Sequence, residues 1–367
     1  MKIVFDSKIF YHQKFGGPSR YFFNLFENLN LINESAYIVS PTYSNNYLKN
    51  SQFKKNILGI NVPKIKFSNI IFTEIDKFAS KLIIKKIKPQ ILHTTDYFES
   101  KTDTNSPLVV TVHDLIHEIF FTEFAKEKDY RPKKRILNLA DHIICVSENT
   151  KKDLIKFYDI DEKKITVIYH GNSFSNIKSS FNIESTTKLN FKYFLYIGSR
   201  KRYKNFFSLI DAFSENRQIY NEYKIVCVGG GKLLNSETKR LKEKNIDLNK
   251  IIIFPNNDDN LLYNLYKNAS ALIYPSSYEG FGMPVVEAMG LGCPVICSNS
   301  SSLPEVYGNA ALSFSPNSKN ELSKAIEKIV FDQDFRKKII EFGFIQSKKF
   351  SWEKCAKETL SVYKKLI

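Results

Sequence analysis

The chain has 367 residues, of which 43% are hydrophobic and 25% are charged, and its formal net charge is +16. This length allows two domains with separate cores, and this composition is that of a globular protein rather than a disordered or fibrous one. No apolar stretch approaches the ~20 residues that a membrane-spanning helix requires. The composition therefore excludes fibrous and disordered classes and predicts a globular protein without a membrane span.

The first residues, MKIVFD, are typical of a first strand rather than of a signal peptide. Five cysteines, an odd number without paired spacing, indicate reduced thiols. Cys293 and Cys297 have no histidine nearby in the sequence, so we interpret them as small core residues and not as metal ligands. We expect a cytoplasmic protein that needs no metal or other cofactor.

Short apolar runs alternate with longer helical patterns along the chain, which predicts parallel α/β sheets. The first half is expected to hold a helix over 18–30 and strands at 2–5, 36–40, 90–93, 108–112, 142–146 and 165–168. A second series of strands is expected at 193–197, 223–228, 250–254, 271–274, 294–297 and 312–314. The polar residues between the two series, 173–189, are interpreted as a linker.

These elements predict two doubly wound, Rossmann-like domains, over 1–172 and 190–350, that face each other across a cleft. The last segment, 351–367, is expected to form a helix that crosses back to the first domain. Ligands in such folds lie beyond the carboxyl ends of the strands. The predicted cleft is therefore the place to look for functional residues.

The positive charge is densest over residues 49–88, which carry ten lysines against Glu74 and Asp76. One interpretation is a solvated helix that packs on the sheet through an apolar stripe of Ile71, Ile75, Phe78 and Leu82. The other is docking on anionic lipid headgroups, to which each lysine near the surface contributes ~1 kcal/mol. We expect no nucleic-acid partner, because no helix-turn-helix, RNP-type or zinc-finger pattern is present.

Two segments of the first half place polar groups after strands. Gly16-Gly17-Pro18 opens the helix at 18–30, and its glycines and the helix N-terminus favour a phosphate, although an ordinary tight turn would have the same sequence. His113 directly follows the strand at 108–112. A histidine in that position is a candidate active-site residue, and a structural role is the alternative.

In the second half, residues 198–205 follow the first strand and supply Arg200, Lys201, Arg202 and Lys204 beside a glycine turn. Arginine and lysine there would neutralise a diphosphate. Gly230 lies in a run of three glycines after the next strand, where a flat base could pack against the backbone, or where the loop could simply be flexible.

The segment YEGFGMPVVEAM at 278–289 is the most informative part of the sequence. Glu279 and Glu287 flank a glycine-rich turn that leads into a helix with Pro284 in its first turn. A carboxylate among apolar residues needs polar partners, and sugar hydroxyls are suitable ones. An anionic ligand with hydroxyl groups beside its phosphates, such as a nucleotide sugar, would suit this turn.

The chain resembles the GT-B glycosyltransferases of the large retaining family 4 over nearly its whole length. The motifs that carry the resemblance are GGPSRYFFNL at 16–25, TVHDLIHE at 111–118, ICVSENTKKDL at 144–154, VIYHGN at 167–172, YIGSRKRYKNF at 196–206 and YEGFGMPVVEAMGLGCPVICSNSSSLPEV at 278–306. The last of these is highly specific.

The resemblance implies roles for individual residues. Glu279 would bind donor-sugar hydroxyls, Glu287 the ribose, and Lys204 the phosphates, with Arg200 as its partner and Arg202 as the rival. His113 would lie next to the transferring sugar. The expected catalytic residues are therefore His113, Arg200, Lys204 and Glu279, and the expected donor-binding residues are Gly16, Gly17, Gly230, Asn256, Gly280, Phe281, Gly282, Met283 and Glu287.

Pro255-Asn256 stands where the family often has a glycine and an aromatic residue near the base, so a uracil and a guanine base both stay open. The resemblance implies metal-independent transfer with retention, from a nucleotide sugar to a lipid-linked saccharide at the inner face of the cytoplasmic membrane. A soluble sugar acceptor and a catalytically silent binding subunit are the alternatives.

Overall fold

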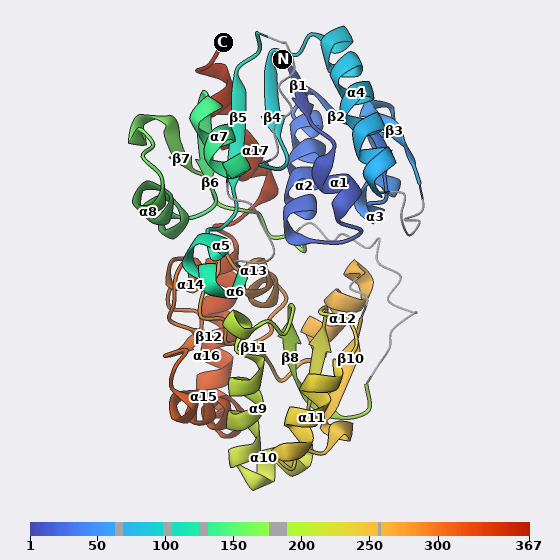
Figure 1. The fold of residues 1–367 in the computed structure, drawn as a ribbon. Helices are drawn as coiled ribbons and strands as arrows, with labels where there is room; N and C mark the ends of the chain where they lie inside the picture. Colours follow the sequence, from blue (N-terminus) through green and yellow to red (C-terminus); the bar gives the residue numbers. More distant parts are fainter. Residues whose placement is uncertain (63–68, 98–104, 125–130, 176–188, 256–257) are drawn as a thin grey trace. The chain divides into compact units, whose positions relative to one another are not determined.

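The structure of the chain, a computed structural model, describes residues 1–62, 69–97, 105–124, 131–175, 189–255 and 258–367. The chain divides into two compact units: Met1–Gly171 with Ser351–Ile367, here unit 1, and Asn172–Phe350, here unit 2. The predicted linker at 173–189 is described only at residues 173–175 and 189. Each unit is a parallel sheet flanked by helices (Figure 1), which confirms the predicted α/β class with two doubly wound sheets.

Unit 1 has a seven-stranded sheet in the order β3-β2-β1-β4-β5-β6-β7, and the paired strands are parallel. Its strands are β1 (Lys2–Phe5), β2 (Ser35–Tyr43), β3 (Ile57–Asn61), β4 (Ile91–Thr94), β5 (Leu108–Val112), β6 (His142–Cys145) and β7 (Ile165–Val167). Its helices are α1 (Lys8–His12), α2 (Gly17–Leu31), α3 (Asn46–Lys49), α4 (Asn69–Ile87), α5 (Ile116–Ile119), α6 (Phe121–Phe124), α7 (Arg131–Leu139), α8 (Glu148–Phe157) and α17 (Trp352–Lys364).

Unit 2 has a six-stranded sheet in the order β10-β9-β8-β11-β12-β13, and its paired strands are also parallel. Its strands are β8 (Lys192–Ile197), β9 (Tyr223–Val228), β10 (Ile251–Phe254), β11 (Ala271–Tyr274), β12 (Val295–Ser298) and β13 (Leu312–Phe314). Its helices are α9 (Phe206–Glu215), α10 (Arg217–Glu222), α11 (Asn235–Glu243), α12 (Asp259–Asn268), α13 (Met283–Gly290), α14 (Leu303–Tyr307), α15 (Lys319–Phe331) and α16 (Gln333–Ser347).

The strands predicted from apolar runs are confirmed to within one to three residues at their ends, but β3 was not predicted. Only Ile57 of this edge strand is buried, so it lacks the apolar run that marks the inner strands. Gly59 allows its backbone to approach β2, because a Cβ atom there would lie 1.6 Å from the carbonyl oxygen of Ser40. An edge strand of this kind carries little hydrophobic signal.

Helices begin where short polar side chains replace the missing intrahelical partners of the first amides. Ser147 accepts a hydrogen bond from the amide of Thr150 at the start of α8, and Ser351 accepts one from Lys354 at the start of α17. Asp258 does the same for Leu261 at the start of α12. Each cap fixes the residue at which its helix begins, and therefore the residue at which the preceding loop ends.

The apolar stripe predicted to pack on the sheet is wrong at Phe78 and Leu82, and the side chains of Ile71 and Ile75 lie outside what the structure describes. Phe78 and Leu82 of α4 are 69% and 54% exposed, whereas Ile84 is buried against β1, β2 and β4. Asp76 is buried as well, because its carboxylate accepts hydrogen bonds from the amide and the hydroxyl of Thr42, at 2.7 and 2.9 Å. The hydrogen-bonded carboxylate of Asp76, and not the ring of Phe78, therefore lies on the buried face of α4.

None of the helices within the described residues is long and apolar enough to span a membrane.

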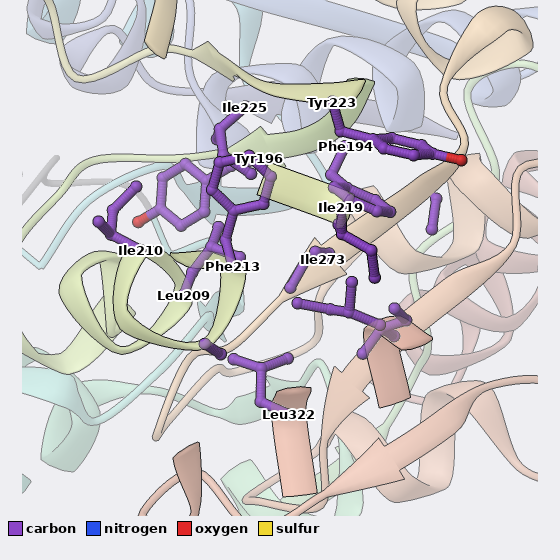
Figure 2. Close-up of a cluster of buried hydrophobic side chains, with 14 of the residues drawn as sticks. Phe194, Tyr196, Leu209, Ile210, Phe213, Ile219, Tyr223, Ile225, Ile273 and Leu322 are labelled. Atoms are coloured by element: carbon purple, nitrogen blue, oxygen red, sulfur yellow. The ribbon is translucent and has the colours of Figure 1, made fainter. Parts of the chain in front are cut away.

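The core of unit 2 fills the space between its sheet and the helices α9, α10 and α15. Figure 2 shows aromatic rings from β8 and β9 beside aliphatic side chains from α9. Phe194 and Tyr223 stack with ring centroids 4.9 Å apart, which joins β8 to the start of β9. Cys293 and Cys297 are buried thiols of the same unit, as predicted.

Helix α17 packs against α2 in unit 1, and buried hydrogen bonds hold its last turn. The Tyr363 hydroxyl lies 2.6 Å from Nδ1 of His93, and Nε2 of His93 lies 2.8 Å from the hydroxyl of Thr111. Thr111 is 3.2 Å from the hydroxyl of Tyr21 in α2. Burial and, to a lesser extent, the nearby His113 lower the pKa of His93 to about 3, so these hydrogen bonds form around a neutral imidazole.

We expect unit 1 to lose stability in acid. The unfolded chain binds a proton at His93 below pH 6.5 and the folded chain does not, so stability is full above 6.5 and falls as the pH drops towards 3. His93→Gln should reduce the loss in unfolding free energy between pH 7.5 and 5.5 by about 1.4 kcal/mol. Urea titrations followed by the fluorescence of Trp352 measure this, because it is the only tryptophan of the chain and lies in unit 1.

The matched control for this titration is His12→Gln, because the side chain of His12 is exposed. It should show the same acid sensitivity as the unsubstituted chain. An equal loss in His93→Gln and in the unsubstituted chain would contradict the neutral state of His93.

Candidate active site

Strand order reverses in unit 2 between β8 and β11, the first strands of its two halves. The loops after these neighbouring parallel strands therefore leave the same edge of the sheet and diverge, which is where ligands bind in doubly wound folds. The loop after β8 contains residues 198–205, and the loop after β11 contains 275–282. Both were singled out from the sequence, and the structure brings them together.

Lys204 and Glu279 form an ion pair across these two loops. Nζ of Lys204 lies 2.5 Å from Oε1 of Glu279, and the two side chains are only 13% and 9% exposed. Nζ of Lys204 also lies 5.5 Å from the centre of the Tyr274 ring. Two residues that are 75 positions apart in the chain thus meet at the edge of the sheet where the strand order reverses.

Direct hydrogen bonds join the two loops around this pair. The amide and the hydroxyl of Ser277 donate to the carbonyl of Tyr203, at 2.7 and 2.9 Å. The side-chain amide of Asn205 donates to the carbonyls of Pro275 and Pro316. Asn205 itself has a left-handed backbone, with φ of 51°, which asparagine tolerates better than most residues. Sequence reasoning missed Asn205, although an asparagine directly before a helix was a usable signal.

A row of serines after β12 holds the turn that carries Glu279. Ser300 and Ser302 donate to the carbonyls of Ser277 and Glu279, at 2.5 and 2.8 Å. Ser301 accepts a hydrogen bond from the amide of Glu279, at 2.8 Å. The sequence analysis quoted these serines without a role. Their clustering after a strand was the signal, because serine hydroxyls satisfy backbone groups of a neighbouring loop.

The remaining predicted residues of the turn lie in or before α13. Gly282 has φ of 98°, and a Cβ atom there would lie 2.7 Å from Leu303. Glu287 is buried, and its Oε2 accepts a hydrogen bond from Tyr266 of α12 at 2.9 Å. Phe281 is also buried and packs edge-on against Phe350, so only its backbone, like that of Gly280, suits a ligand. Met283, in the first turn of α13, is half-buried.

Arg200, predicted to bind a diphosphate, donates to protein acceptors. Its Nε donates to Glu237 at 3.0 Å, and its terminal nitrogens donate to the carbonyls of residues 229–232. Gly230 of this loop lies close to the turn after β8, because a Cβ atom on it would lie 3.2 Å from the carbonyl oxygen of Gly198. The roles predicted for Arg200 and Gly230 stay predictions. Asn256 lies outside the described residues.

Unit 1 has a cavity of about 580 Å³ at the carboxyl ends of β1, β4 and β5. Its lining is largely apolar but includes both acidic and basic side chains. The residues around it include Gln13, Asp96, His113, Asp114, Glu118 and Lys133. Nζ of Lys133 pairs with Glu118 at 2.8 Å and donates to the carbonyl of Asp114 at 3.0 Å. A cavity of this size at strand ends can hold a sugar-sized ligand.

His113 lies on this cavity, and burial lowers its pKa to about 4, with Asp114 opposing the shift and Lys133 adding to it. Nε2 of His113 is buried and has no hydrogen-bond partner among the described residues. A neutral imidazole with an unpaired buried nitrogen is unusual, because buried polar atoms are nearly always satisfied. The predicted contact of His113 with a ligand would give this nitrogen a partner.

The predicted phosphate turn opens α2. Gly16 is the N-terminal cap, and Gly17 and Pro18 begin the helix. A Cβ atom on Gly16 would lie 2.2 Å from Oε1 of Gln13, which accepts a hydrogen bond from the amide of Ser19. A side chain at position 16 would therefore have to displace the side chain of Gln13 from its hydrogen bond with Ser19. Within the described residues, no group of three or more histidine, cysteine or acidic residues could hold a metal ion.

The sequence matches two families of known proteins. Residues 15–172 match the family described as Glycosyltransferase Family 4, and residues 178–346 match the family described as Glycosyl transferases group 1. The two matches include every predicted site residue.

Two bacterial enzymes are similar in sequence. O-antigen chain mannosyltransferase B of Escherichia coli is 31% identical over 277 residues, which cover 70% of each chain. O-antigen chain mannosyltransferase RfbU of Salmonella typhimurium is 32% identical over 250 residues, 67% of this chain and 65% of that protein. Among solved structures, Anabaena HepE in complex with UDP-glucose is similar in fold, with a TM-score of 0.75 at 17% identity over 99% of this chain and 100% of that one.

We expect Lys204 and Glu279 to depend on each other for stability. Lys204→Met leaves a mostly buried carboxylate without its cation, which should cost ~3 kcal/mol of unfolding free energy. Lys204→Met combined with Glu279→Gln should recover most of that loss, because no buried charge is left. Urea titrations followed by circular dichroism measure both, with Lys201→Met, at an exposed neighbour, as the control. Equal stability of the single and double variants would contradict the pairing.

Proposed function

Because the chain belongs to the GT-B glycosyltransferases of family 4, we propose that it transfers a sugar from a nucleotide-sugar donor to a hydroxyl of a growing surface polysaccharide. The donor is a GDP- or UDP-sugar, and the similar O-antigen mannosyltransferases favour a mannosyl group and an O-antigen-type acceptor. The pair of Lys204 and Glu279 at the reversal of strand order is the observation that carries this proposal.

Lys204 binds the donor phosphates and Glu279 binds hydroxyls of the transferring sugar. Each needs a polar partner in the absence of a donor, because both side chains are largely buried, and each supplies it to the other. A donor that brings phosphate to the lysine and hydroxyls to the carboxylate replaces both halves of the pair. Glu287 binds the ribose, and the hydrogen bond that Tyr266 donates to its Oε2 holds the carboxylate in place.

Transfer proceeds with retention at the anomeric carbon, by front-side displacement. The bond from the anomeric carbon to the diphosphate oxygen breaks, and the bond to the acceptor oxygen forms on the same face. The acceptor proton passes to the leaving diphosphate oxygen. The pairing of Glu279 with a lysine suits hydroxyl binding better than nucleophilic attack, so the protein acts by positioning and by stabilising charge on the diphosphate.

A transfer assay with GDP-mannose and a panel of UDP-sugars, on a lipid-linked saccharide primer and in EDTA, tests this function. We expect product from one nucleotide class, with the anomeric configuration of the donor and without loss of rate in EDTA. Lys204→Ala should lower turnover by ~10²-fold or more, because it removes the cation that stabilises the charge on the leaving diphosphate. Lys201→Ala is the matched control. Full dependence on a divalent cation would overturn the metal-independent mechanism, and unchanged turnover of Lys204→Ala would overturn the role of the lysine.

The acceptor is lipid-linked, and helix α4 docks unit 1 on anionic lipid. Phe78 and Leu82 are exposed one turn apart, and Lys81, Lys85 and Lys86 are exposed beside them. Residues three and four apart share a helix face, so this face is apolar at its centre and cationic around it. Such a face suits the surface of an anionic bilayer, where apolar side chains enter the headgroup region and lysines stay above it.

Phe78→Ser with Leu82→Ser should reduce co-sedimentation with anionic phospholipid vesicles at least tenfold, because two large apolar side chains no longer enter the interface. The matched control is Ile155→Ser with Phe157→Ser, two side chains of α8 that are each 40% exposed. Equal retention of both double variants would contradict docking through α4. Absence of binding by the unsubstituted chain would contradict membrane association altogether.

A further inference from the structure

The side chain of Arg200 is enclosed by the protein. It is only 2% exposed, and its guanidinium is hydrogen-bonded on every nitrogen. Nε pairs with Glu237, and the terminal nitrogens reach four successive carbonyls, those of Gly229 at 3.4 Å, Gly230 and Gly231 at 3.2 Å each, and Lys232 at 2.8 Å. The planar fork of an arginine suits such a set of acceptors, which engage donors that would otherwise be available to a diphosphate.

The loop of residues 229–232 is curled around the guanidinium by its glycines. Gly229, Gly230 and Gly231 have φ of 87°, 72° and 70°, three successive left-handed residues that side chains other than hydrogen would strain. In a trans peptide the carbonyl of one residue and the amide of the next point in opposite directions. Four carbonyls directed at Arg200 therefore direct four amides, those of residues 230–233, away from it.

These four amides have no partner within the described part of the chain. The loop is open to solvent, since Gly230 and Lys232 are exposed and Gly231 is half-exposed. Successive backbone amides that face one side form a concave site for anions and other hydrogen-bond acceptors. The loop also adjoins the turn after β8, where a Cβ atom on Gly230 would lie 3.2 Å from the carbonyl oxygen of Gly198.

Glu237 holds the guanidinium from the other side. Its Oε1 accepts from Arg200 at 3.0 Å, and its Oε2 accepts from the amide of Leu234 at 2.8 Å, at the start of α11. The carboxylate thus fixes the loop at its end and neutralises the arginine. Because the charge of Arg200 is compensated, its effect on a ligand passes through the geometry of the loop.

We propose that Arg200 is a positioning residue, which with Glu237 turns the amides of residues 230–233 outward to bind acceptor atoms of the donor's nucleoside diphosphate. This inference rests on the proposed function. It makes Lys204 the cation that binds the diphosphate, and it gives Arg200 a role that its position in the sequence did not indicate. It also explains the three glycines, which the left-handed loop requires for its conformation rather than for flexibility.

Labelling the glycines of the full chain with ¹⁵N tests the loop directly, since the chain has only 14 of them. Saturating UDP or GDP should shift the amide protons of Gly230 and Gly231 downfield. The signals of Gly292 and Gly308, left-handed glycines elsewhere in unit 2, should not move. A nucleotide that binds without shifting Gly230 or Gly231 would overturn this inference and leave the glycosyltransferase function intact. If neither nucleotide bound the unsubstituted chain, both would fail.

Glu237→Gln distinguishes positioning from a direct contact of Arg200 with phosphate. If Arg200 acts through the loop, Glu237→Gln loosens the loop and should weaken UDP or GDP binding by about tenfold, the effect of one charge-assisted hydrogen bond. If Arg200 binds the diphosphate, Glu237→Gln releases it from a competitor, and affinity should stay the same or rise. That second result would overturn the proposal.

Arg200→Gln should move the Gly230 and Gly231 signals of the ligand-free chain, and Arg202→Gln, which removes the same charge two residues later, should not. Unmoved signals in Arg200→Gln would also overturn the proposal. The measurements on the unsubstituted chain and on Glu237→Gln hold even if Arg200→Gln fails to fold.

Discussion

Parallel pairing with one reversal of strand order is the constraint on which the site of unit 2 depends. β8 and β11 are neighbours in the sheet, although 73 residues lie between Ile197 at the end of β8 and Ala271 at the start of β11. Because both strands end at the same edge, their following loops diverge and leave room for a ligand. Lys204 and Glu279 meet there for this reason. The pair is thus a consequence of topology first and of side-chain chemistry second.

Hydrogen bonds between loops then convert this coarse placement into a defined geometry. Asn205 and Ser277 tie the loop after β8 to the loop after β11, and the serines after β12 hold the backbone of Glu279. Short hydroxyl and amide side chains suit this task, since they satisfy backbone groups without filling space. A charged side chain that must meet a ligand needs such support, because a displacement of about 1 Å weakens an electrostatic contact and misaligns its hydrogen bonds.

The sequence predicted most of the sheets, because inner strands of a parallel sheet are continuous apolar runs. It also predicted which loops would carry function, since glycines and charges clustered after those runs. It failed where the deciding contact joins distant residues. The buried position of Asp76 depends on Thr42, and this contact turns Phe78 outward. Periodicity within one helix does not contain that information.

Arg200 and Lys204 show the same limit within one loop. The two cations lie four positions apart, and composition alone treats them alike. Their surroundings differ: four carbonyls and a carboxylate enclose the planar guanidinium, whereas one carboxylate faces the ammonium. Five bonds in fixed directions make the arginine part of the fold, while a lysine with a single ionic partner can exchange that partner for another anion. The number and direction of donors, and not the charge, therefore separate the cation that shapes the loop from the one available to a ligand.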